Sequence, residues 1–248
     1  MERNEQAMAG NGDKSSVEEI RQRFDTEVER FSNLETGQLA KVDSPLAMAL
    51  IAEVAAATTP KATSVLDVGC GAGNYTLKLL ERLPNLNVTL IDLSQAMLDR
   101  AEERLRPVTS GNIEAIQGDI RQIDIGGQRH DIILAASVLH HLRDDSQWGS
   151  VFEKFYKALR PGGSVWIFDL IESSIPEVQS TMHRRYGEYL AQLKDGAYRD
   201  QVFAYIEKED TPRSLMFQLD LLREVGFSKV EVLHKNACFA AFGAMKAS

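Results

Sequence analysis

Two hydrophobic patterns alternate along the middle of the chain. Short apolar runs, such as Val88-Thr89-Leu90-Ile91, predict buried strands. Between these runs, apolar residues recur at spacings of three and four, which predicts amphipathic helices. We expect strands near 64–68, 87–92, 112–117, 131–136 and 163–169, and helices near 73–83, 94–105 and 146–160. This alternation is typical of an α/β fold with a doubly wound, mostly parallel sheet.

Helices are also predicted ahead of the sheet. Apolar residues at spacings of three and four predict an amphipathic helix over 17–31. A second helix is expected over 45–57, with Ser44 as its N-cap and Pro45 at its first position. Residues 1–16 have little apolar content, so we expect a tail followed by a single domain over 17–248, with the N-terminal helices at 17–57.

The strand–helix alternation stops after Asp169. Residues 174–210 carry aromatic and aliphatic residues at helical spacing, which predicts a helical insertion after the fifth strand. We expect this insertion and the helix at 17–31 to cover the acceptor site like a lid. Packing of the insertion's aromatics into a core of its own is the alternative. The pattern ends with a helix over 211–225, Gly226 as its C-cap, and strands near 228–234 and 237–245.

A glycine-rich motif follows the first predicted strand. Asp67 precedes glycines at alternate positions, Gly69, Gly71 and Gly73. Glycine has no Cβ, so the backbone here can turn sharply and approach a ligand closely. An acid ahead of the loop would repel a pyrophosphate, but it suits a ligand with an ammonium and a sulfonium group. A plain turn from strand to helix is the alternative interpretation.

Acidic residues also follow the second and third predicted strands. Asp92 comes about 20 residues after the glycine motif, where a carboxylate can accept hydrogen bonds from both ribose hydroxyls of an adenosine. Asp92 could equally cap the helix that starts at Ser94. Asp119 stands at the end of the third strand, where an ordinary turn also favours an acid.

Five segments in one order resemble the class I S-adenosylmethionine-dependent methyltransferases: 65–75, Asp92, 117–120, 131–142 and 159–167. The resemblance covers roughly residues 40–170, with a weaker match at 211–246. It implies a seven-stranded, Rossmann-like sheet that ends in an antiparallel hairpin. It also implies S-adenosylmethionine as cofactor and S-adenosylhomocysteine as product. The cofactor-binding residues implied are Asp67, Gly69, Cys70, Gly71, Gly73, Asp92, Leu93, Met97, Asp119, Ile120, Ala136 and His140.

Candidate catalytic residues follow the fourth and fifth predicted strands. His140 and His141 lie at the carboxyl edge of the sheet, where open α/β sheets bind ligands. His140 is a candidate for lining the cofactor pocket and for a general base, with a polar surface loop as the alternative. Asp169 could face the acceptor or be a solvated acid. We expect no metal, because no further His or Cys spacing completes a ligand set with Asp144 and Asp145.

The C-terminal part also resembles the carboxy-S-adenosylmethionine synthase family of tRNA wobble-uridine modification. The matching segments are Met182-His183, 196–199 and 222–227. In that family an arginine of the insertion pairs with the extra carboxylate, and Arg199 is the nearest candidate here. The glycine motif departs from that family, because it has the extra glycine of ordinary methyltransferases. We therefore expect methyl transfer to a small-molecule acceptor, with carboxy-S-adenosylmethionine synthesis as the alternative.

Composition narrows the function further. The net charge of −8 argues against direct nucleic-acid binding and so against a tRNA methyltransferase. A protein methyltransferase stays an alternative, as does a non-enzymatic cofactor-binding module, since fold does not fix function. Two cysteines, Cys70 and Cys238, make no disulfide framework and favour a reducing cytoplasm. No apolar run approaches the ~18 residues that span a membrane. The acceptor, its attacking atom and the oligomeric state stay open, a homodimer included.

Overall fold

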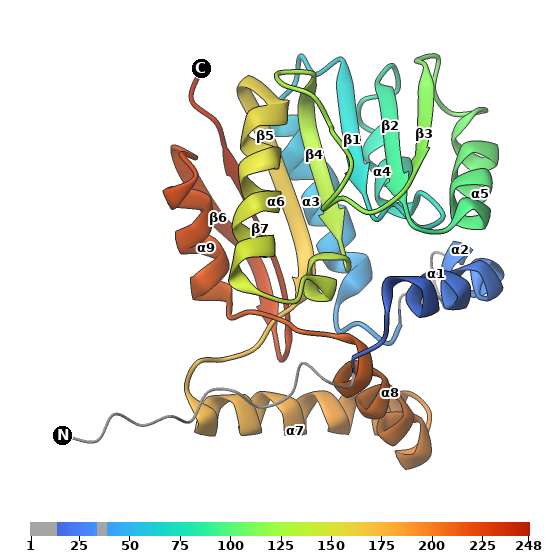
Figure 1. Ribbon diagram of the computed structural model, residues 1–248, viewed down its shortest axis with the longest axis vertical. Helices are drawn as coiled ribbons and strands as arrows, with labels where there is room; N and C mark the ends of the chain where they lie inside the picture. Colours follow the sequence, from blue (N-terminus) through green and yellow to red (C-terminus); the bar gives the residue numbers. More distant parts are fainter. Residues whose placement is uncertain (1–13, 34–38) are drawn as a thin grey trace.

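One mixed sheet organises the protein (Figure 1). The computed structural model describes residues 14–33 and 39–248, so most of the predicted tail lies outside the described residues. Within them, seven strands follow the order β3-β2-β1-β4-β5-β7-β6. β1 to β5 pair in parallel, whereas β7 pairs antiparallel with β5 and β6. The strands are β1 (Ser64–Val68), β2 (Asn87–Asp92), β3 (Ile113–Gln117), β4 (His130–Ala136), β5 (Leu159–Leu170), β6 (Lys229–Asn236) and β7 (Phe239–Met245). The expected mostly parallel sheet and its antiparallel hairpin are confirmed.

Helices cover both faces of the sheet and bury its alternating side chains. Ile132 and Leu134 of β4 pack in one hydrophobic core with residues of α3, α4 and α5. Their neighbours Ile133 and Ala135 pack in a second core with α6 and α9. Successive strand residues point to opposite faces, so both cores form from one apolar run. The helices are α3 (Ser44–Thr58), α4 (Asn74–Leu80), α5 (Gln95–Leu105), α6 (Asp145–Ala158) and α9 (Leu215–Glu224).

Four further helices gather at the carboxyl edge of the parallel strands. α7 (Pro176–Leu193) and α8 (Gly196–Glu209) lie together below this edge in Figure 1, with α1 (Val17–Thr26) and α2 (Val28–Ser32) beside them. The hydroxyl of Tyr186 on α7 donates to the Ala40 carbonyl oxygen at 2.9 Å. The guanidinium of Arg23 on α1 pairs with Glu209 at the end of α8. These contacts join the N-terminal helices to the segment 174–210.

The predicted continuous helix over 17–31 is wrong, because the chain forms two helices that meet at Glu27. The Glu27 N–H donates to the Phe24 carbonyl oxygen at 3.3 Å and closes α1. Phe24 and Phe31 would be about 10 Å apart along one straight helix. The break brings their ring centroids to 5.3 Å.

Three further boundaries differ from the sequence prediction. Asp43, with a left-handed φ of 58°, is the N-cap of α3, so Ser44 is its first helical residue. β5 begins at Leu159, where it pairs with His130, and not near 163. The helix predicted from 211 begins only at Leu215, because Thr211 N–H donates to the His140 carbonyl oxygen at 2.7 Å in an extended segment. That segment brings the end of α8 against the loop that follows β4.

Candidate active site

The glycine motif forms a tight turn between β1 and α4. The N–H groups of Gly69 and Cys70 donate to the Ile91 carbonyl oxygen at 2.8 and 3.1 Å. Gly69 has a φ of +64°, and a Cβ there would lie 2.5 Å from the Val138 side chain. Both the conformation and the crowding therefore require glycine at this position. The turn leaves the backbone of the motif open to the ligand side of the sheet.

Asp92 ties the end of β2 to this turn. One carboxylate oxygen accepts from the Gly71 N–H at 2.8 Å, and the other accepts from the Ser94 N–H at 2.9 Å. The N-cap of α5 is Ser94, whose hydroxyl accepts from Met97 N–H at 3.1 Å, so Asp92 is not the helix cap. Burial raises the pKa of Asp92 to about 6. The side chain lines two cavities at this edge of the sheet.

Asp67 is a buried acid that lines the larger of these two cavities. The residue is only 1% exposed, and its carboxylate accepts a hydrogen bond from Thr76 Oγ1 at 2.7 Å. Burial raises the pKa of Asp67 to about 7, although the hydrogen bond from Thr76 opposes this shift. A buried carboxylate is costly unless a cation compensates it. The position therefore favours a ligand with an ammonium group.

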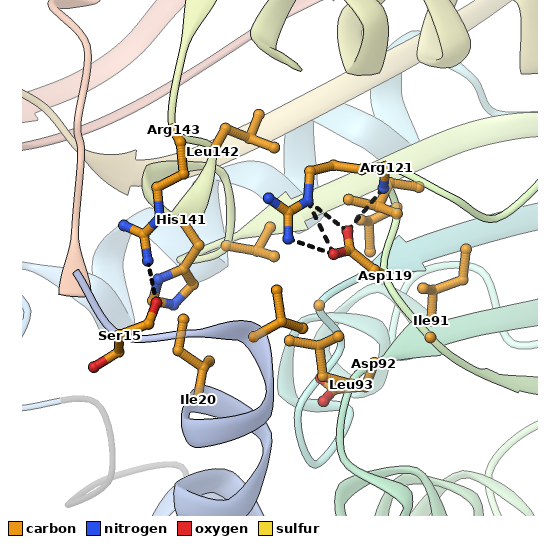
Figure 2. A pocket seen from close by; sticks show the side chains of 16 residues that line it. Ser15, Ile20, Ile91, Asp92, Leu93, Asp119, Arg121, His141, Leu142 and Arg143 are labelled. Carbon is orange, nitrogen blue, oxygen red and sulfur yellow. Dashed lines mark hydrogen bonds and ion pairs between the residues drawn. The ribbon is translucent and has the colours of Figure 1, made fainter. Parts of the chain in front are cut away.

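A small cavity of about 80 Å³ lies between the ends of β2 and β3 and helix α1 (Figure 2). Figure 2 shows Asp119 and Arg121 facing each other on one side, and His141 beside Ser15 and Arg143 on the other. Arg121 Nε donates to both carboxylate oxygens of Asp119 at 2.9 Å. Burial alone would raise the pKa of Asp119, but Arg121 outweighs it and lowers that pKa. Ile20 of α1 enters the cavity from the side opposite Asp119.

A larger cavity of about 590 Å³ runs from the glycine motif to α1, α7 and α8. Its cofactor end contains Asp67, Gly71 and Asp92. Its far wall combines aromatic and aliphatic side chains with charged ones, among them Arg23, Arg30, Lys41 and Lys194. The residues of that wall include Phe24, Phe31, Tyr186, Tyr198, Val202, Tyr205, Ile206 and Phe239.

The cofactor-binding residues predicted from the sequence gather around the two cavities, with one exception. Gly73 lines neither of them: it is the N-cap of α4, and a Cβ there would meet Ala101 at 3.3 Å. The predicted residues that line a cavity are Asp67, Gly69, Cys70, Gly71, Asp92, Leu93, Met97, Asp119, Ile120, Ala136 and His140.

The predicted catalytic residues lie in three different settings. His140 lines the large cavity, whereas Asp169 is fully buried behind it. Arg199 of α8 pairs with Asp200 at 2.8 Å and lines neither cavity. Of these candidates, the structure brings His140 and Asp169 together and leaves Arg199 apart.

Asp169 fixes the short helix η1 (Leu139–His141) that carries the histidines. One carboxylate oxygen accepts from the Leu139 N–H at 2.8 Å and the His140 N–H at 3.3 Å. The other accepts from the Leu170 N–H at 2.7 Å and bonds His140 Nδ1. All these contacts hold the His140 ring with Nε2 turned away from Asp169. The carboxylate thus positions His140 and does not reach the cavity.

Asp210 faces both histidines from the end of α8. Its Oδ1 lies 3.7 Å from His140 Nε2 and 3.4 Å from His141 Nδ1. Burial alone would lower the pKa of His140, but the carboxylates of Asp169 and Asp210 outweigh it and raise that pKa. Burial, followed by the neighbouring His140, lowers the pKa of His141 well below its usual value. Burial raises the pKa of Asp210 to about 6.

Sequence reasoning missed Asp210 and the particular residues of α1 that line the large cavity. Asp210 stands between two predicted helices with no periodicity to mark it, and only the fold places it beside residues 70 positions earlier. Arg23 and Phe24 of α1 line the large cavity, and their helical spacing predicted an amphipathic helix without showing where its buried face would pack. The adjacent pair His140-His141 was the one local signal of this cluster.

Comparison with known proteins identifies the family. Residues 65–163 match a family described as a methyltransferase domain. The chain is 29% identical to carboxy-S-adenosyl-L-methionine synthase of Wolinella succinogenes, over 94% of this chain and 98% of that protein. It is 30% identical to the synthase of the same name from Trichodesmium erythraeum, over 74% of this chain and 73% of that protein.

A solved structure shares the fold. It is Burkholderia thailandensis 1,6-didemethyltoxoflavin-N1-methyltransferase with its substrate and S-adenosylhomocysteine, with a TM-score of 0.62 and 18% identity over 96% of this chain and 94% of that one. The chain belongs to the S-adenosylmethionine-dependent methyltransferases, and S-adenosylmethionine is its cofactor. Among the described residues, no helix has the length and apolar character needed to cross a membrane.

Proposed function

We propose that the protein transfers the methyl group of S-adenosylmethionine to a small-molecule acceptor held in the large cavity. The observation that carries this proposal is the continuity of that cavity, from the glycine motif to the aromatic wall formed by α7 and α8. Its volume of about 590 Å³ is in the range of pockets that enclose a small ligand. A net charge of −8 argues against tRNA as the acceptor.

The two cavities suggest how the cofactor lies. The adenine enters the small cavity between Ile20 and Ile120, and the ribose hydroxyls bond Asp92 at the boundary of the two cavities. The ammonium group of the methionine part is compensated by Asp67. In this arrangement the sulfonium faces the half of the large cavity that His140 and Tyr186 line.

The aromatic wall defines the acceptor site. Tyr186, Tyr198 and Tyr205 come from α7 and α8, and Phe24 comes from α1. Such side chains bind flat or apolar molecules and exclude water from the sulfonium. We propose that α1 and the insertion 174–210 form a lid over this site.

The chemistry is an in-line displacement. A lone pair of the acceptor forms the new bond to the methyl carbon, while the electron pair of the C–S bond stays on sulfur and gives S-adenosylhomocysteine. Alignment of the two reactants supplies most of the rate enhancement. An acceptor that keeps its proton at neutral pH must lose it, and we propose that His140, positioned by Asp169, activates it.

Carboxy-S-adenosylmethionine synthesis is a second candidate. The similarity to the Wolinella succinogenes synthase covers 94% of this chain, which favours it. The extra carboxylate would need a cation beside the sulfonium, since an unpaired buried carboxylate is costly. Arg199 pairs with Asp200 outside the cavity. The placement of Arg199, the arginine that the resemblance implies, favours ordinary methyl transfer, while the cations that do line the cavity are others, such as Arg30, Lys41 and Lys194.

We place the reaction in the cytoplasm, because both cysteines are free and Cys70 lies in the ligand-binding turn.

The test of the function is release of S-adenosylhomocysteine during incubation with a panel of small hydroxylated, aminated and carboxylated metabolites. An acceptor-dependent release that falls in Tyr198→Ala and persists in the surface variant Val232→Ala supports the proposal. Binding of the cofactor without release for any class of acceptor contradicts it.

A further inference from the structure

Three ligand atoms converge where the cofactor and acceptor halves of the large cavity meet. They are His140 Nε2, His141 Nδ1 and Asp210 Oδ1. Each of the three residues offers one ligand atom within 4.8 Å of those of the other two. Oδ1 is 3.4 Å from His141 Nδ1 and 3.7 Å from His140 Nε2. Ligand atoms held about 2.1 Å from a tetrahedral metal ion are about 3.4 Å apart. The two measured separations are therefore close to those of a metal site.

Two of these atoms have no hydrogen-bond partner among the described residues. They are His141 Nδ1 and Asp210 Oδ1, which are both buried and lie near each other. Buried polar atoms in folded proteins nearly always have a partner, so an atom without one points to a missing ligand. A cation placed among the three atoms would satisfy both.

The supporting contacts orient each imidazole for coordination. Asp169 bonds His140 Nδ1, which leaves Nε2 for a ligand in the cavity. A carboxylate behind a metal-binding histidine is the usual outer partner in such sites. The ring of His141 bonds the backbone of Glu209, which leaves Nδ1 free to coordinate. Thr211 N–H donates to the His140 carbonyl oxygen at 2.7 Å and holds Asp210 in place.

The surrounding charges permit a cation. Arg23 is the closest guanidinium on α1, and its charge is compensated by Glu209. The guanidinium of Arg143 donates hydrogen bonds to the carbonyl oxygens of Glu209 and Ser15. The buried carboxylates of Asp169 and Asp210 remain beside the two imidazoles and also face the ammonium group of Lys41, so two negative charges stand against one positive charge there.

We propose that His140, His141 and Asp210 bind one divalent transition-metal ion. Two imidazoles and one carboxylate suit Zn²⁺, Fe²⁺ or Co²⁺, whereas Mg²⁺ and Ca²⁺ prefer oxygen ligands. The three protein ligands leave positions open toward the cavity. The sequence offered no third ligand for the histidine pair, because Asp210 reaches it only through the fold.

The ion also indicates the chemical class of the acceptor, and this inference rests on the proposed function. An acceptor with a hydroxyl beside a second oxygen can occupy two open positions of the ion. With its Nε2 bound to the ion, His140 acts as a ligand and not as the base. The hydroxyl proton is instead released to solvent as the oxygen coordinates, because a bound metal lowers the pKa of such a group. The oxygen lone pair then forms the O–CH₃ bond, and the C–S electron pair leaves on sulfur.

Metal binding can be tested on the whole protein without an acceptor. The protein is stripped with a chelator, freed of it, and titrated with Zn²⁺ by calorimetry and with Co²⁺ by visible absorption. We expect one ion per chain, with affinity at least about a hundredfold lower in His141→Gln and in Asp210→Asn, because even outer partners of a metal are worth about 10–100-fold. Excess Mg²⁺ should not compete.

His234→Gln is the matched control, because His234 Nε2 also pairs with an aspartate, Asp43, at 2.8 Å, away from the cavity. Binding of S-adenosylhomocysteine by each variant reports that its fold is intact. Absence of saturable Zn²⁺ binding, or equal binding in His141→Gln and the wild type, overturns the metal site. Methylated product from a metal-free enzyme would reject the role of the metal in activating the acceptor but support the proposed methyl transfer. Metal binding with no product from any acceptor would support the metal site but contradict the proposed methyl transfer.

Discussion

Thr76 on α4 donates a 2.7 Å hydrogen bond to the buried carboxylate of Asp67 at the end of β1. The bond favours the ionised carboxylate, yet burial dominates and raises the pKa of Asp67 to about 7. In the unliganded protein Asp67 is therefore largely protonated below pH 7. Binding of an ammonium group requires the ionised form, so the proton must leave when the cofactor binds.

We predict that S-adenosylhomocysteine binds more weakly as the pH falls below about 7, by up to about tenfold per pH unit. The sign follows from the raised pKa of Asp67, since protons compete with the ligand below that value. The pKa of Asp92, raised to about 6, steepens the loss at lower pH. Calorimetry at a series of pH values measures this dependence.

Two variants separate Asp67 from the other groups. Thr76→Val removes the hydrogen bond that lowers the pKa of Asp67, so the midpoint should move to higher pH. Asp67→Asn should bind weakly and show little pH dependence above pH 7. A wild-type dissociation constant that stays constant from pH 6 to pH 8 would contradict the placement of the ammonium group at Asp67.

The second prediction concerns Asp92. Asp92→Ala should raise the dissociation constant of S-adenosylhomocysteine roughly tenfold to a hundredfold, since hydrogen bonds to a charged group are worth about 1.5–3 kcal/mol. The control is Ser94→Ala, which removes the N-cap of α5 and should lower stability by about 1 kcal/mol with a small effect on affinity.

Asp92 also accepts a hydrogen bond from the Gly71 N–H, so Asp92→Ala could weaken cofactor binding by disturbing the turn alone. A cofactor analogue without ribose hydroxyls distinguishes the two effects. If Asp92 bonds the ribose, Asp92→Ala should bind the analogue and S-adenosylhomocysteine with nearly equal affinity. A variant that still discriminates between them as the wild type does would reduce Asp92 to a support for the turn.

The third prediction is that α1, α7 and α8 open and close over the acceptor site. Within this group Arg23 of α1 pairs with Glu209 of α8. The attachment of α7 to the rest includes Tyr186, which bonds the Ala40 carbonyl oxygen and packs against Phe239 of β7. In α8 only Glu209 is buried, which indicates low local stability. Hydrogen exchange in their amides should slow when S-adenosylhomocysteine binds, while the core of β4 stays protected in both states. Equal protection of these helices with and without ligand would show that they are fixed structure.

Local patterns in the sequence predict most of the sheet, because strands such as β1 and β4 are short apolar runs between turns. The cofactor end follows for the same reason: the glycine motif and Asp92 each stand where a strand stops. The acceptor end does not, because its residues come from α1, η1, α7 and α8, which meet only in the folded chain. No periodicity relates Asp210 to His140. The break at Glu27 is equally hidden, since it depends on the packing of Phe24 against Phe31.

The last prediction distinguishes the two enzymatic functions. Arg199 Nε donates to Asp200 at 2.8 Å, and the Arg199 side chain is 42% exposed, so it cannot compensate a carboxylate buried beside the sulfonium. We expect Arg199→Ala to leave cofactor binding and turnover within about twofold of the wild type, as for most surface substitutions. Incubation with S-adenosylmethionine and prephenate, the carboxyl donor that the resemblance to the synthase family implies, should give no carboxylated cofactor by mass spectrometry. A product in which a carboxyl group replaces a hydrogen, lost in Arg199→Ala and kept in Arg184→Ala, would establish carboxylation and would require α8 to rotate Arg199 into the cavity.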